Sequence, residues 1–315
     1  MDTPRLAKDI MPTRLVTLSA REHVFDGIGF LLKHDISGAP VTDSEDRYLG
    51  VFSEKCCMRV LTATARIVAG SEQSAGDRTR ARDFMVRKLI TLSPGMDVFE
   101  AIDLLLKNRI SGAPVLDEND NFLGVFSEKT SMRVLIESAY GQLPTTRVEA
   151  FLNTDLGRVV AAENSLLDIA QKFLDTPYRR LVVLRNGKLL GQISRRDVLR
   201  AEHHLSAILR NCSHAQSAPG GIDQDDPLSA TIRGRLSAGR VRGFMDAHAA
   251  TITEETDLLR MARIFLDTPY RRLPVLRDGQ LVGLVTRRDL LRATLRLMDV
   301  VPRRTQAPLY LSSIA

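Results

Sequence analysis

Two segments in the second half of the chain combine a hydroxyl group and a carboxylate at one spacing, and an arginine pair precedes each. The hydroxyl–carboxylate combinations are Ser194 with Asp197 and Thr286 with Asp289. The arginine pairs are Arg179-Arg180 and Arg271-Arg272. If a helix begins after each hydroxyl, its free amides favour an anion, and its third residue offers a carboxylate to ligand hydroxyls. Because arginine makes bidentate contacts with phosphate, these residues predict recognition of a phosphate-bearing ligand.

The same spacing has a second explanation. A Ser or Thr followed three residues later by an acidic residue forms a capping box, which satisfies the free amides of a helix start without any ligand. The two explanations are compatible, because Ser194 can cap a helix whose Asp197 also binds a ligand.

Internal repeats define the folding unit that must position these residues. The segment FLDTPYRRL occurs at Phe173–Leu181 and again at Phe265–Leu273. Near-copies of ISGAPV…LGVFSEK occupy Ile36–Lys55 and Ile110–Lys129. The 315 residues therefore divide into four copies of a unit of roughly 50 residues. Almost no sequence is left over for a separate catalytic domain, so we do not expect an enzyme.

Each copy predicts the order β-α-β-β-α. The opening β-rich runs are Leu15–Leu18, Leu89–Leu92, Val159–Ala161 and Thr251–Thr253. A helix follows, and in the second copy its apolar face is formed by Val98, Ile102, Leu105 and Leu106. Asn186-Gly187 and Asp278-Gly279 predict type I′ hairpin turns, which need positive φ at both positions. The N-caps expected for the second helices are Ser53, Ser127, Ser194 and Thr286.

The copies should pack in pairs, because one copy cannot bury both faces of a three-stranded sheet. Connectors 69–80 and 211–239 are longer than connector 139–146, which suggests that copies one and two form one pair and copies three and four the other. We therefore predict an α/β (α+β) fold of two pseudo-two-fold pairs. The expected domains are 1–146, with repeats at about 8–63 and 82–137, and 147–300, with repeats at about 149–201 and 242–293 around a linker, 202–241. The tail 301–315 has no repeat counterpart.

The basic residues are concentrated in the second half of the chain. Residues 1–146 carry 18 Lys and Arg against 20 Asp and Glu, whereas residues 147–315 carry 26 against 18. Of those 26 basic residues, 24 are Arg. This composition suits phosphate-bearing partners, although a solvated basic face would have the same composition.

Other features narrow the class of protein. No run approaches the ~18 uninterrupted apolar residues of a membrane span, and the N-terminus lacks the apolar core of a signal peptide. Cys56, Cys57 and Cys212 suit reduced, buried thiols in a cytoplasmic protein. His203-His204 and His214 lack the spacing of a metal site, so no metal is expected. No recognition helix or aromatic-basic stripe supports nucleic-acid binding.

With these repeats and motifs, the chain resembles a tandem of cystathionine-β-synthase (CBS) domains, four copies forming two Bateman modules. The resemblance covers roughly residues 8–300 and rests on the repeated element order, on the SGAPV and RRLPV sequences at the second strand, and on the signature G-h-h-[ST]-x-x-D. That signature occupies Gly191–Asp197 in the third copy and Gly283–Asp289 in the fourth.

The resemblance implies an adenosine-nucleotide site in the second pair, because the family's nucleotide-binding members use these motif positions. The implied ribose contacts are Asp197 and Asp289. The implied phosphate contacts are Ser194, Thr286, Arg179, Arg180, Arg271 and Arg272. The implied base pocket includes Val160 and Ile252. The ligand would be AMP, ADP, ATP or S-adenosylmethionine.

The first pair departs from the family pattern. Cys56 and Thr130 stand where the second pair has Asp, and Ser37-Gly38 and Ser111-Gly112 replace the basic pairs. We therefore do not expect nucleotide binding in residues 1–146, which could instead pack against the second pair, dock a protein or bind another ligand. Two pairs of charged residues in the first turn of the second helices should be solvated, namely Glu54-Lys55 and Glu128-Lys129.

The expected function is that of a cytoplasmic regulatory protein. A nucleotide held across two copies would change their relative packing, and an unknown partner protein would respond to the two states. Such coupling is usually ~1–3 kcal/mol. The alternative is a ligand-free scaffold whose basic face docks an acidic partner. Either function is compatible with a homodimer.

Overall fold

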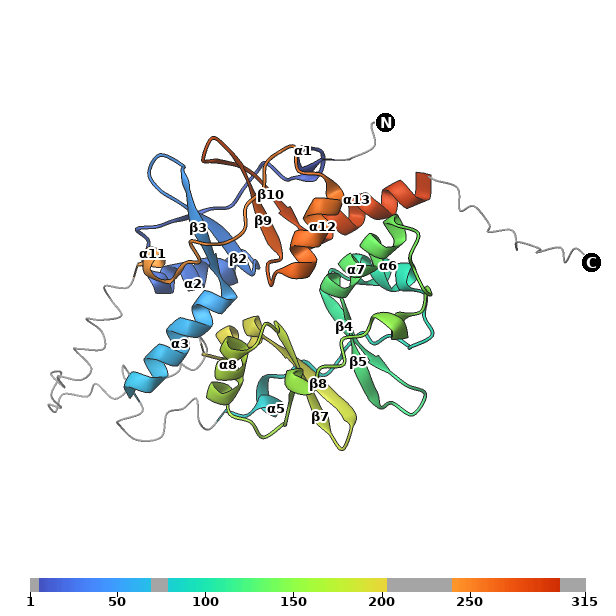
Figure 1. Ribbon diagram of the computed structural model, residues 1–315. Helices are drawn as coiled ribbons and strands as arrows, with labels where there is room; N and C mark the ends of the chain where they lie inside the picture. Colours follow the sequence, from blue (N-terminus) through green and yellow to red (C-terminus); the bar gives the residue numbers. More distant parts are fainter. Residues whose placement is uncertain (1–5, 69–78, 203–239, 301–315) are drawn as a thin grey trace, which may run out of the picture.

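The computed structural model describes residues 6–68, 79–202 and 240–300 (Figure 1). The predicted order recurs in all four repeats. Repeat one contains β1 (Leu18–Ser19), α2 (Val24–Lys33), β2 (Gly38–Thr42), β3 (Tyr48–Ser53) and α3 (Glu54–Val68). Repeat two contains α6 (Val98–Lys107), β4 (Gly112–Leu116), β5 (Phe122–Ser127) and α7 (Glu128–Ala139), and its opening strand is a single parallel bridge, Leu92 to Val115.

Repeats three and four follow the same plan. Repeat three contains β6 (Val159–Val160), α8 (Leu166–Asp175), β7 (Arg180–Arg185), β8 (Lys188–Ser194) and the helical residues 195–202. Repeat four contains α12 (Leu258–Asp267), β9 (Arg272–Arg277), β10 (Gln280–Thr286) and α13 (Arg287–Val300), with an opening bridge from Ile252 to Val275. In each repeat the opening strand is parallel to the first hairpin strand, and the two hairpin strands are antiparallel.

Local sequence signals account for these boundaries. Asn186 and Gly187 have φ of 51° and 76°, and Asp278 and Gly279 have φ of 51° and 79°, which confirms the predicted turns. The second helices begin directly after the four predicted caps. In α6 the predicted apolar face is fully inside, because all four of its residues are buried.

A short segment precedes each repeat and packs on a different repeat. These leading segments are α1 (Ala7–Ile10), α5 (Ala81–Phe84), η1 (Val148–Phe151) and α11 (Val241–Phe244). The amide of Ala7 donates to the carbonyl of Thr256, and the amide of Val241 donates to that of Glu22, so repeats one and four exchange their leading segments. Repeats two and three do the same through the amides of Ala81 and Val148, which donate to Asn164 and Met96.

The pairing predicted from connector lengths is therefore wrong. The hairpins of repeats one and four are joined by the bridge of Arg47 with Gln280, and those of repeats two and three by the bridge of Asn121 with Lys188. The short connector lies inside a pair, because the exchange of leading segments brings together the two repeats that it joins. The residues predicted as domains 1–146 and 147–300 thus each contribute one repeat to each pair.

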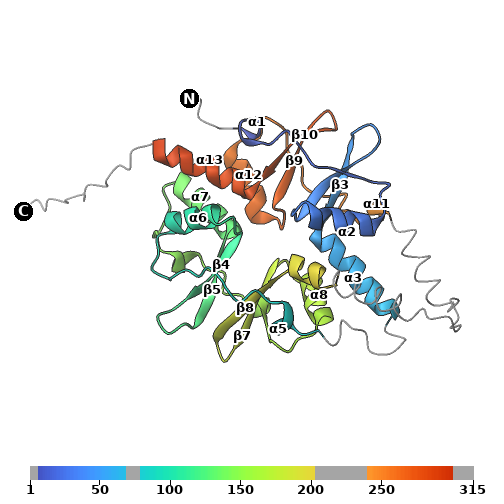
Figure 2. The ribbon, with the colours of Figure 1, turned by 180° about the vertical axis from the view of Figure 1, so that it is seen from behind.

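Helices hold the two pairs together as a ring. Helix α3 of repeat one packs against α8 of repeat three, and α7 of repeat two packs against α12 of repeat four. Around the ring the order is one, four, two, three, as both sides of the molecule show (Figures 1 and 2). No helix in the described ranges is long and apolar enough to cross a membrane.

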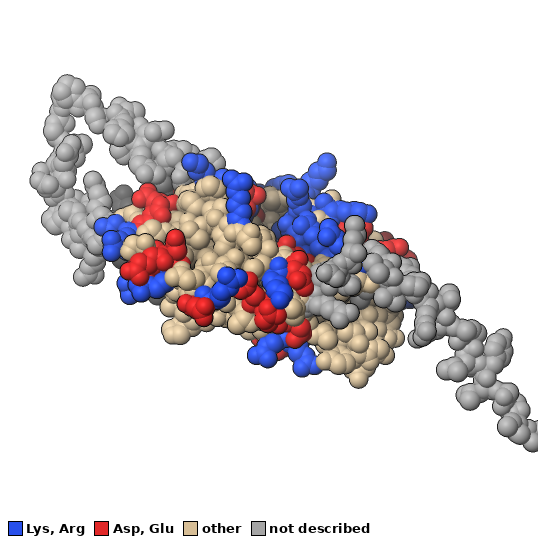
Figure 3. All heavy atoms as spheres, turned by 90° about the horizontal axis from the view of Figure 1, so that it is seen from above, with Lys and Arg blue, Asp and Glu red and all other residues tan. Residues whose placement is uncertain are grey.

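The charge asymmetry of the chain does not produce a one-sided molecule. Repeats three and four, which carry the excess of arginine, lie diagonally across the ring rather than beside each other. Seen from above, basic and acidic side chains are interspersed over the surface (Figure 3). The solvated basic face that was the alternative explanation of this composition is therefore not seen in that view.

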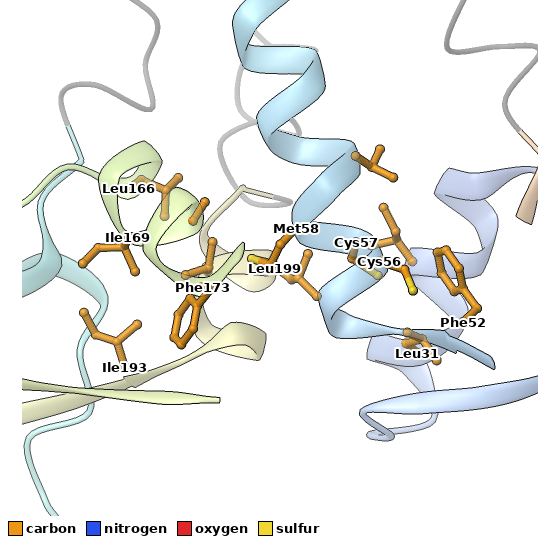
Figure 4. Close-up of a cluster of buried hydrophobic side chains, with 14 of the residues drawn as sticks. Leu31, Phe52, Cys56, Cys57, Met58, Leu166, Ile169, Phe173, Ile193 and Leu199 are labelled. Carbon is orange, nitrogen blue, oxygen red and sulfur yellow. The ribbon is translucent and has the colours of Figure 1, made fainter. Parts of the chain in front are cut away.

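The hydrophobic core is divided between repeats that are neighbours across the two pairs rather than between the exchanged partners. One cluster joins repeats one and three, and its centre is Met58 on α3, between Phe52 and Leu31 on one side and Phe173 and Leu199 on the other (Figure 4). A second cluster joins repeats two and four. Two residues of the first cluster, Cys56 and Cys57, are buried free thiols, as expected. Cys212 and the histidines His203, His204 and His214 lie outside the described residues.

Candidate functional site

The two hydroxyl–carboxylate combinations form capping boxes. Oδ2 of Asp197 accepts from the amide of Ser194 at 2.8 Å and from its hydroxyl at 2.7 Å. Oδ2 of Asp289 accepts from the amide of Thr286 at 3.0 Å and from its hydroxyl at 2.5 Å. The second oxygen of each aspartate, Oδ1, has no hydrogen bond among the described residues. The capping explanation is thus met by one oxygen, and the other is free for a ligand.

The arginine pairs reach from repeats three and four to repeats one and two. Nη1 of Arg179 lies 3.4 Å from the Ser37 hydroxyl, and Nη1 of Arg272 lies 2.8 Å from the same atom. These two contacts bring repeats three and four onto repeat one. Two guanidinium groups therefore meet at the neutral hydroxyl of Ser37. A single anion bound there would offset the charge of both.

The other member of each pair points to repeat two. Nη1 of Arg180 donates to the carbonyl of Gly112 at 3.3 Å, and Nη2 of Arg271 donates to Oε2 of Glu128 at 2.8 Å. All four predicted arginines thus lie where the four repeats meet. Residues far apart in the sequence form one cationic cluster at the centre of the ring.

Burial and mutual repulsion both act on this cluster. Burial lowers the pKa of Arg179 well below its ordinary value, and the charges of Arg271 and Arg272 lower it further, although Glu54 opposes them. Burial, followed by the charge of Arg271, lowers the pKa of Arg272 to about 10. The same two causes lower the pKa of Arg180, while Asp197 and two glutamates act in the opposite direction. A bound anion would relieve this repulsion.

The two acidic residues expected to be solvated are buried. Glu128 is 2% exposed and Glu54 is 7% exposed, because each packs against the repeat that adjoins its own across the two pairs, repeat four for Glu128 and repeat three for Glu54. Oε1 of Glu128 lies 3.5 Å from Arg288, and Oε1 of Glu54 lies 3.2 Å from Arg196. Burial alone would raise the pKa of Glu128, but nearby arginines, Arg271 foremost, outweigh it and hold the pKa below its ordinary value.

A cavity of about 380 Å³ opens beside the arginine cluster. Three repeats line it: repeat two from Ser111 to Arg133, repeat three with the segment before it, and repeat four through Leu266, Pro269, Arg271 and Arg287. Its basic residues are Lys129, Arg133, Arg158, Arg179, Arg180, Arg271 and Arg287, and its one acidic residue is Glu128. The lining is strongly cationic, and its volume is within the ~300–1,000 Å³ of small-molecule sites.

The cavity gathers some of the predicted site residues and not others. Three predicted phosphate contacts line it, namely Arg179, Arg180 and Arg271. The predicted residues outside its lining are Arg272, Ser194, Thr286, Asp197 and Asp289. The two predicted base-pocket residues, Val160 and Ile252, are 5% and 6% exposed and belong to the two hydrophobic clusters. One wall comes from repeat two, in the half of the chain where no nucleotide site was expected.

Sequence reasoning missed Arg158, which is 7% exposed and lines the cavity. Its guanidinium carbon lies 4.5 Å from the centre of the Tyr178 ring, and its Nε has no hydrogen-bond partner among the described residues. Burial lowers its pKa. No sequence signal identified it, because it precedes β6 outside every motif.

Arg287, also missed, is 6% exposed and has an equivalent in Arg195. Both donate to carbonyl groups near the end of the preceding helix, Arg287 to Phe265 at 2.7 Å and Arg195 to Phe173 at 3.0 Å. The sequence did contain an indication of this shared role, because Arg195 and Arg287 directly follow the Ser or Thr of the G-h-h-[ST]-x-x-D signature in repeats three and four. In the described ranges no group of His, Cys, Asp and Glu could hold a metal ion.

Comparison with known proteins identifies relatives of the chain. The uncharacterized protein MJ1225 of Methanocaldococcus jannaschii is 23% identical over 213 residues, which are 67% of this chain and 68% of that protein. The chloroplastic CBS domain-containing protein CBSX1 of Arabidopsis thaliana is 26% identical over 220 residues, 68% of this chain and 64% of that protein. Among solved structures, CBSX2 in complex with AMP is 28% identical, covers 41% of this chain and 98% of its own, and has a TM-score of 0.37.

The family model for the CBS domain matches four stretches, 7–63, 81–134, 148–204 and 241–296. Each stretch contains one β-α-β-β-α repeat together with its leading segment. The stretches together account for more than half of the chain, and the expected resemblance is confirmed. The chain therefore belongs to the CBS domain family, with four CBS repeats that form two Bateman modules.

Proposed function

We propose that this protein is a regulatory protein without catalytic activity that binds an adenosine derivative at the centre of the ring. AMP, ADP, ATP and S-adenosylmethionine are the ligands considered. The ligand's effect would be transmitted in the cytoplasm to a partner protein that is still to be identified. AMP, which is bound to the CBSX2 structure, is the first ligand to test.

The convergence of four arginines from two repeats is the observation that carries this proposal. Three of them contact neutral groups, the Ser37 hydroxyl and the Gly112 carbonyl, and form no ion pair among the described residues. Charged hydrogen bonds contribute roughly 1.5–3 kcal/mol each, so a phosphate group here would gain several such terms. The cavity beside the cluster supplies room for the rest of the ligand.

Regulation would follow from the placement of the cluster. The cavity wall comes from repeats two, three and four, and two of the arginines also contact repeat one. A ligand that binds one arrangement of the repeats more tightly than another shifts the equilibrium toward it, in proportion to its difference in affinity. A partner that docks across two repeats would sense the same shift.

The ribose contacts remain part of the proposal. Oδ1 of Asp197 and of Asp289 is available, whereas Oδ2 of each caps its helix. The charge of Asp197 opposes the lowering of the Arg180 pKa, so the carboxylate and the guanidinium interact electrostatically.

The double variant Asp197→Asn, Asp289→Asn is expected to bind the nucleotide about ten- to hundredfold more weakly. Asparagine keeps an oxygen for the helix cap but loses the charge that attracts ribose hydroxyls. Calorimetric titration with AMP, ADP, ATP and S-adenosylmethionine would measure the change. Asp168→Asn is the matched control, since Oδ2 of Asp168 caps α8 in the same way and accepts from the Ser165 amide at 3.0 Å.

Three outcomes separate the possibilities. Binding that the double variant loses and the control keeps would support the nucleotide sensor. Equal binding by wild type and double variant would remove the ribose roles and leave the arginine-lined cavity as the site. If none of the four ligands bound to the wild type, the sensor would be rejected in favour of the ligand-free scaffold.

A further inference from the structure

Glu128 stands out among the groups around the cavity. It is the one acidic residue of a lining that includes seven basic residues, and it is 2% exposed. Its carboxylate accepts from Arg271 at 2.8 Å, and Arg271 lines the same cavity. An anion in the cavity and the carboxylate of Glu128 therefore require the same guanidinium.

We propose that Glu128 is an internal competitor for Arg271, which it holds when the cavity is empty and releases to the anionic group of a bound ligand. The inference rests on the proposed function, because it assigns to one residue the setting of the ligand's affinity. When the cavity is empty, the carboxylate of Glu128 therefore binds Arg271 at the position that a phosphate group would otherwise take. The remaining cluster arginines contact neutral groups and are available without such a competitor.

Release of Arg271 does not leave Glu128 without a counter-charge. Loss of the sole partner of a buried carboxylate strongly destabilises the folded state, because it leaves an uncompensated buried charge. Here Arg288 lies 3.5 Å from Oε1 of Glu128, and it is held in place by a 2.9 Å bond to the carbonyl of Arg109. Because Arg288 is outside the cavity lining, it can keep Glu128 paired while Arg271 turns to the ligand.

The exchange would also be felt between repeats. Glu128 is the first residue of α7 in repeat two, while Arg271 and Arg288 belong to repeat four. Helix α7 packs against α12 of repeat four, so the Glu128–Arg271 pair strengthens one of the two helix contacts that join the pairs into a ring. Ligand binding would replace this direct ion pair between repeats two and four with contacts that both repeats make to the ligand.

Repeat one contains a natural control. Glu54 occupies the position equivalent to Glu128 and is also buried, but its arginine is Arg196, which lies outside the cavity lining. The equivalent of Arg271 on that side is Arg179, which bonds to Ser37 instead of a carboxylate. The two glutamates are thus buried at equivalent positions and differ in whether they hold a cavity arginine.

The test compares Glu128→Gln with Glu54→Gln in the full chain, with inorganic pyrophosphate and AMP as probes. Glu128→Gln is expected to bind both probes about tenfold more tightly than wild type, because Arg271 is freed and the repulsion of the anion is removed. Glu54→Gln should change the affinity less than Glu128→Gln does, since the arginine that Glu54 pairs with, Arg196, does not line the cavity. Isothermal titration measures affinity, and circular dichroism establishes that each variant is folded.

Arg288→Gln supplies a second, independent readout. With Arg288 removed, Glu128 has Arg271 as its remaining partner and should hold it more firmly, so affinity falls severalfold. In the Glu128→Gln background the same change should have little further effect. If the two changes are simply additive, Arg288 acts through its charge alone and the competition is rejected.

The outcomes distinguish this inference from the function on which it rests. If the wild type binds neither probe, and the variants bind neither, the proposed function fails. If the wild type binds and Glu128→Gln binds equally or more weakly, the function stands and the competitor role is wrong. Should Glu128→Gln fail to fold, Glu128→Asp, which shortens the carboxylate's reach toward Arg271, must raise the affinity or the inference falls.

Discussion

Arg271→Glu is expected to lose nucleotide binding by more than about a hundredfold, because it removes one charged hydrogen bond and adds repulsion toward the phosphate. The same change places a carboxylate opposite buried Glu128, from which Arg271 now lies 2.8 Å. Breaking a buried ion pair from one side costs about 3–5 kcal/mol of unfolding free energy. Calorimetric titration and urea denaturation would measure the two effects.

A matched charge reversal on the neighbouring strand is the control. Arg277→Glu lies at the other end of β9 and breaks an exposed pair with Glu254, whose N–O distance is 2.7 Å. Exposed pairs contribute about 0–1 kcal/mol, so both stability and binding should change little. A folded Arg271→Glu protein with wild-type affinity would show that the arginine cluster does not bind the ligand. If the protein is instead a ligand-free scaffold, Arg271→Glu should only weaken the contact with its acidic partner, and that contact should be sensitive to salt.

Gly50→Ala is expected to lower the free energy of unfolding by about 3 kcal/mol, by forcing apart repeats one and four. A Cβ at Gly50 would lie 2.5 Å from the carbonyl oxygen of Asp246, far closer than atoms can approach. The neighbouring residue, Val51, forms two backbone hydrogen bonds with Asp246, of 2.9 and 2.8 Å. The substitution displaces this bridge, which holds the leading segment of repeat four on repeat one.

Gly29→Ala is the matched comparison for that prediction. Nothing lies within 4 Å of a Cβ at Gly29, which is in the middle of α2. Because alanine favours a helix over glycine by about 1 kcal/mol, this variant should be as stable as wild type or more so. The denaturation midpoints of Gly50→Ala and Gly29→Ala would test this prediction. Equal stability of the two variants would mean that the exchange of leading segments contributes little to the free energy of unfolding.

The elements were predictable wherever their cause is local. A turn such as Asn186-Gly187 needs its two residues alone, and a cap such as Ser127 acts within one helical turn. Pairing of the repeats was not predictable in this way, because it depends on leading segments that pack on repeats distant in the sequence. Connector length led to the wrong pairing, because the length of a connector does not determine on which repeat the following leading segment packs.

The candidate site shows the same division. The arginine pairs were found because each occurs at an equivalent place in two repeats, so a shared role was visible in the sequence. The burial of Glu128 was not, because another repeat covers it, and that of Arg158 was not, because it depends on the Tyr178 ring 20 residues further along the chain. An acidic residue in the first turn of a helix is normally solvated, and one sequence alone does not reveal the neighbour that buries it.

The exchange of leading segments between repeats one and four has a consequence during synthesis on the ribosome. Repeats two and three are adjacent in the sequence and can complete their exchange as soon as repeat three emerges. Repeat one must wait for α11, which begins at Val241, long after α3 ends at Val68. At ~5–20 residues per second, that delay is on the order of 10–35 s. During it, the site on repeat one for α11 is exposed, so nascent chains are most vulnerable there to chaperone capture or misassembly with a second copy.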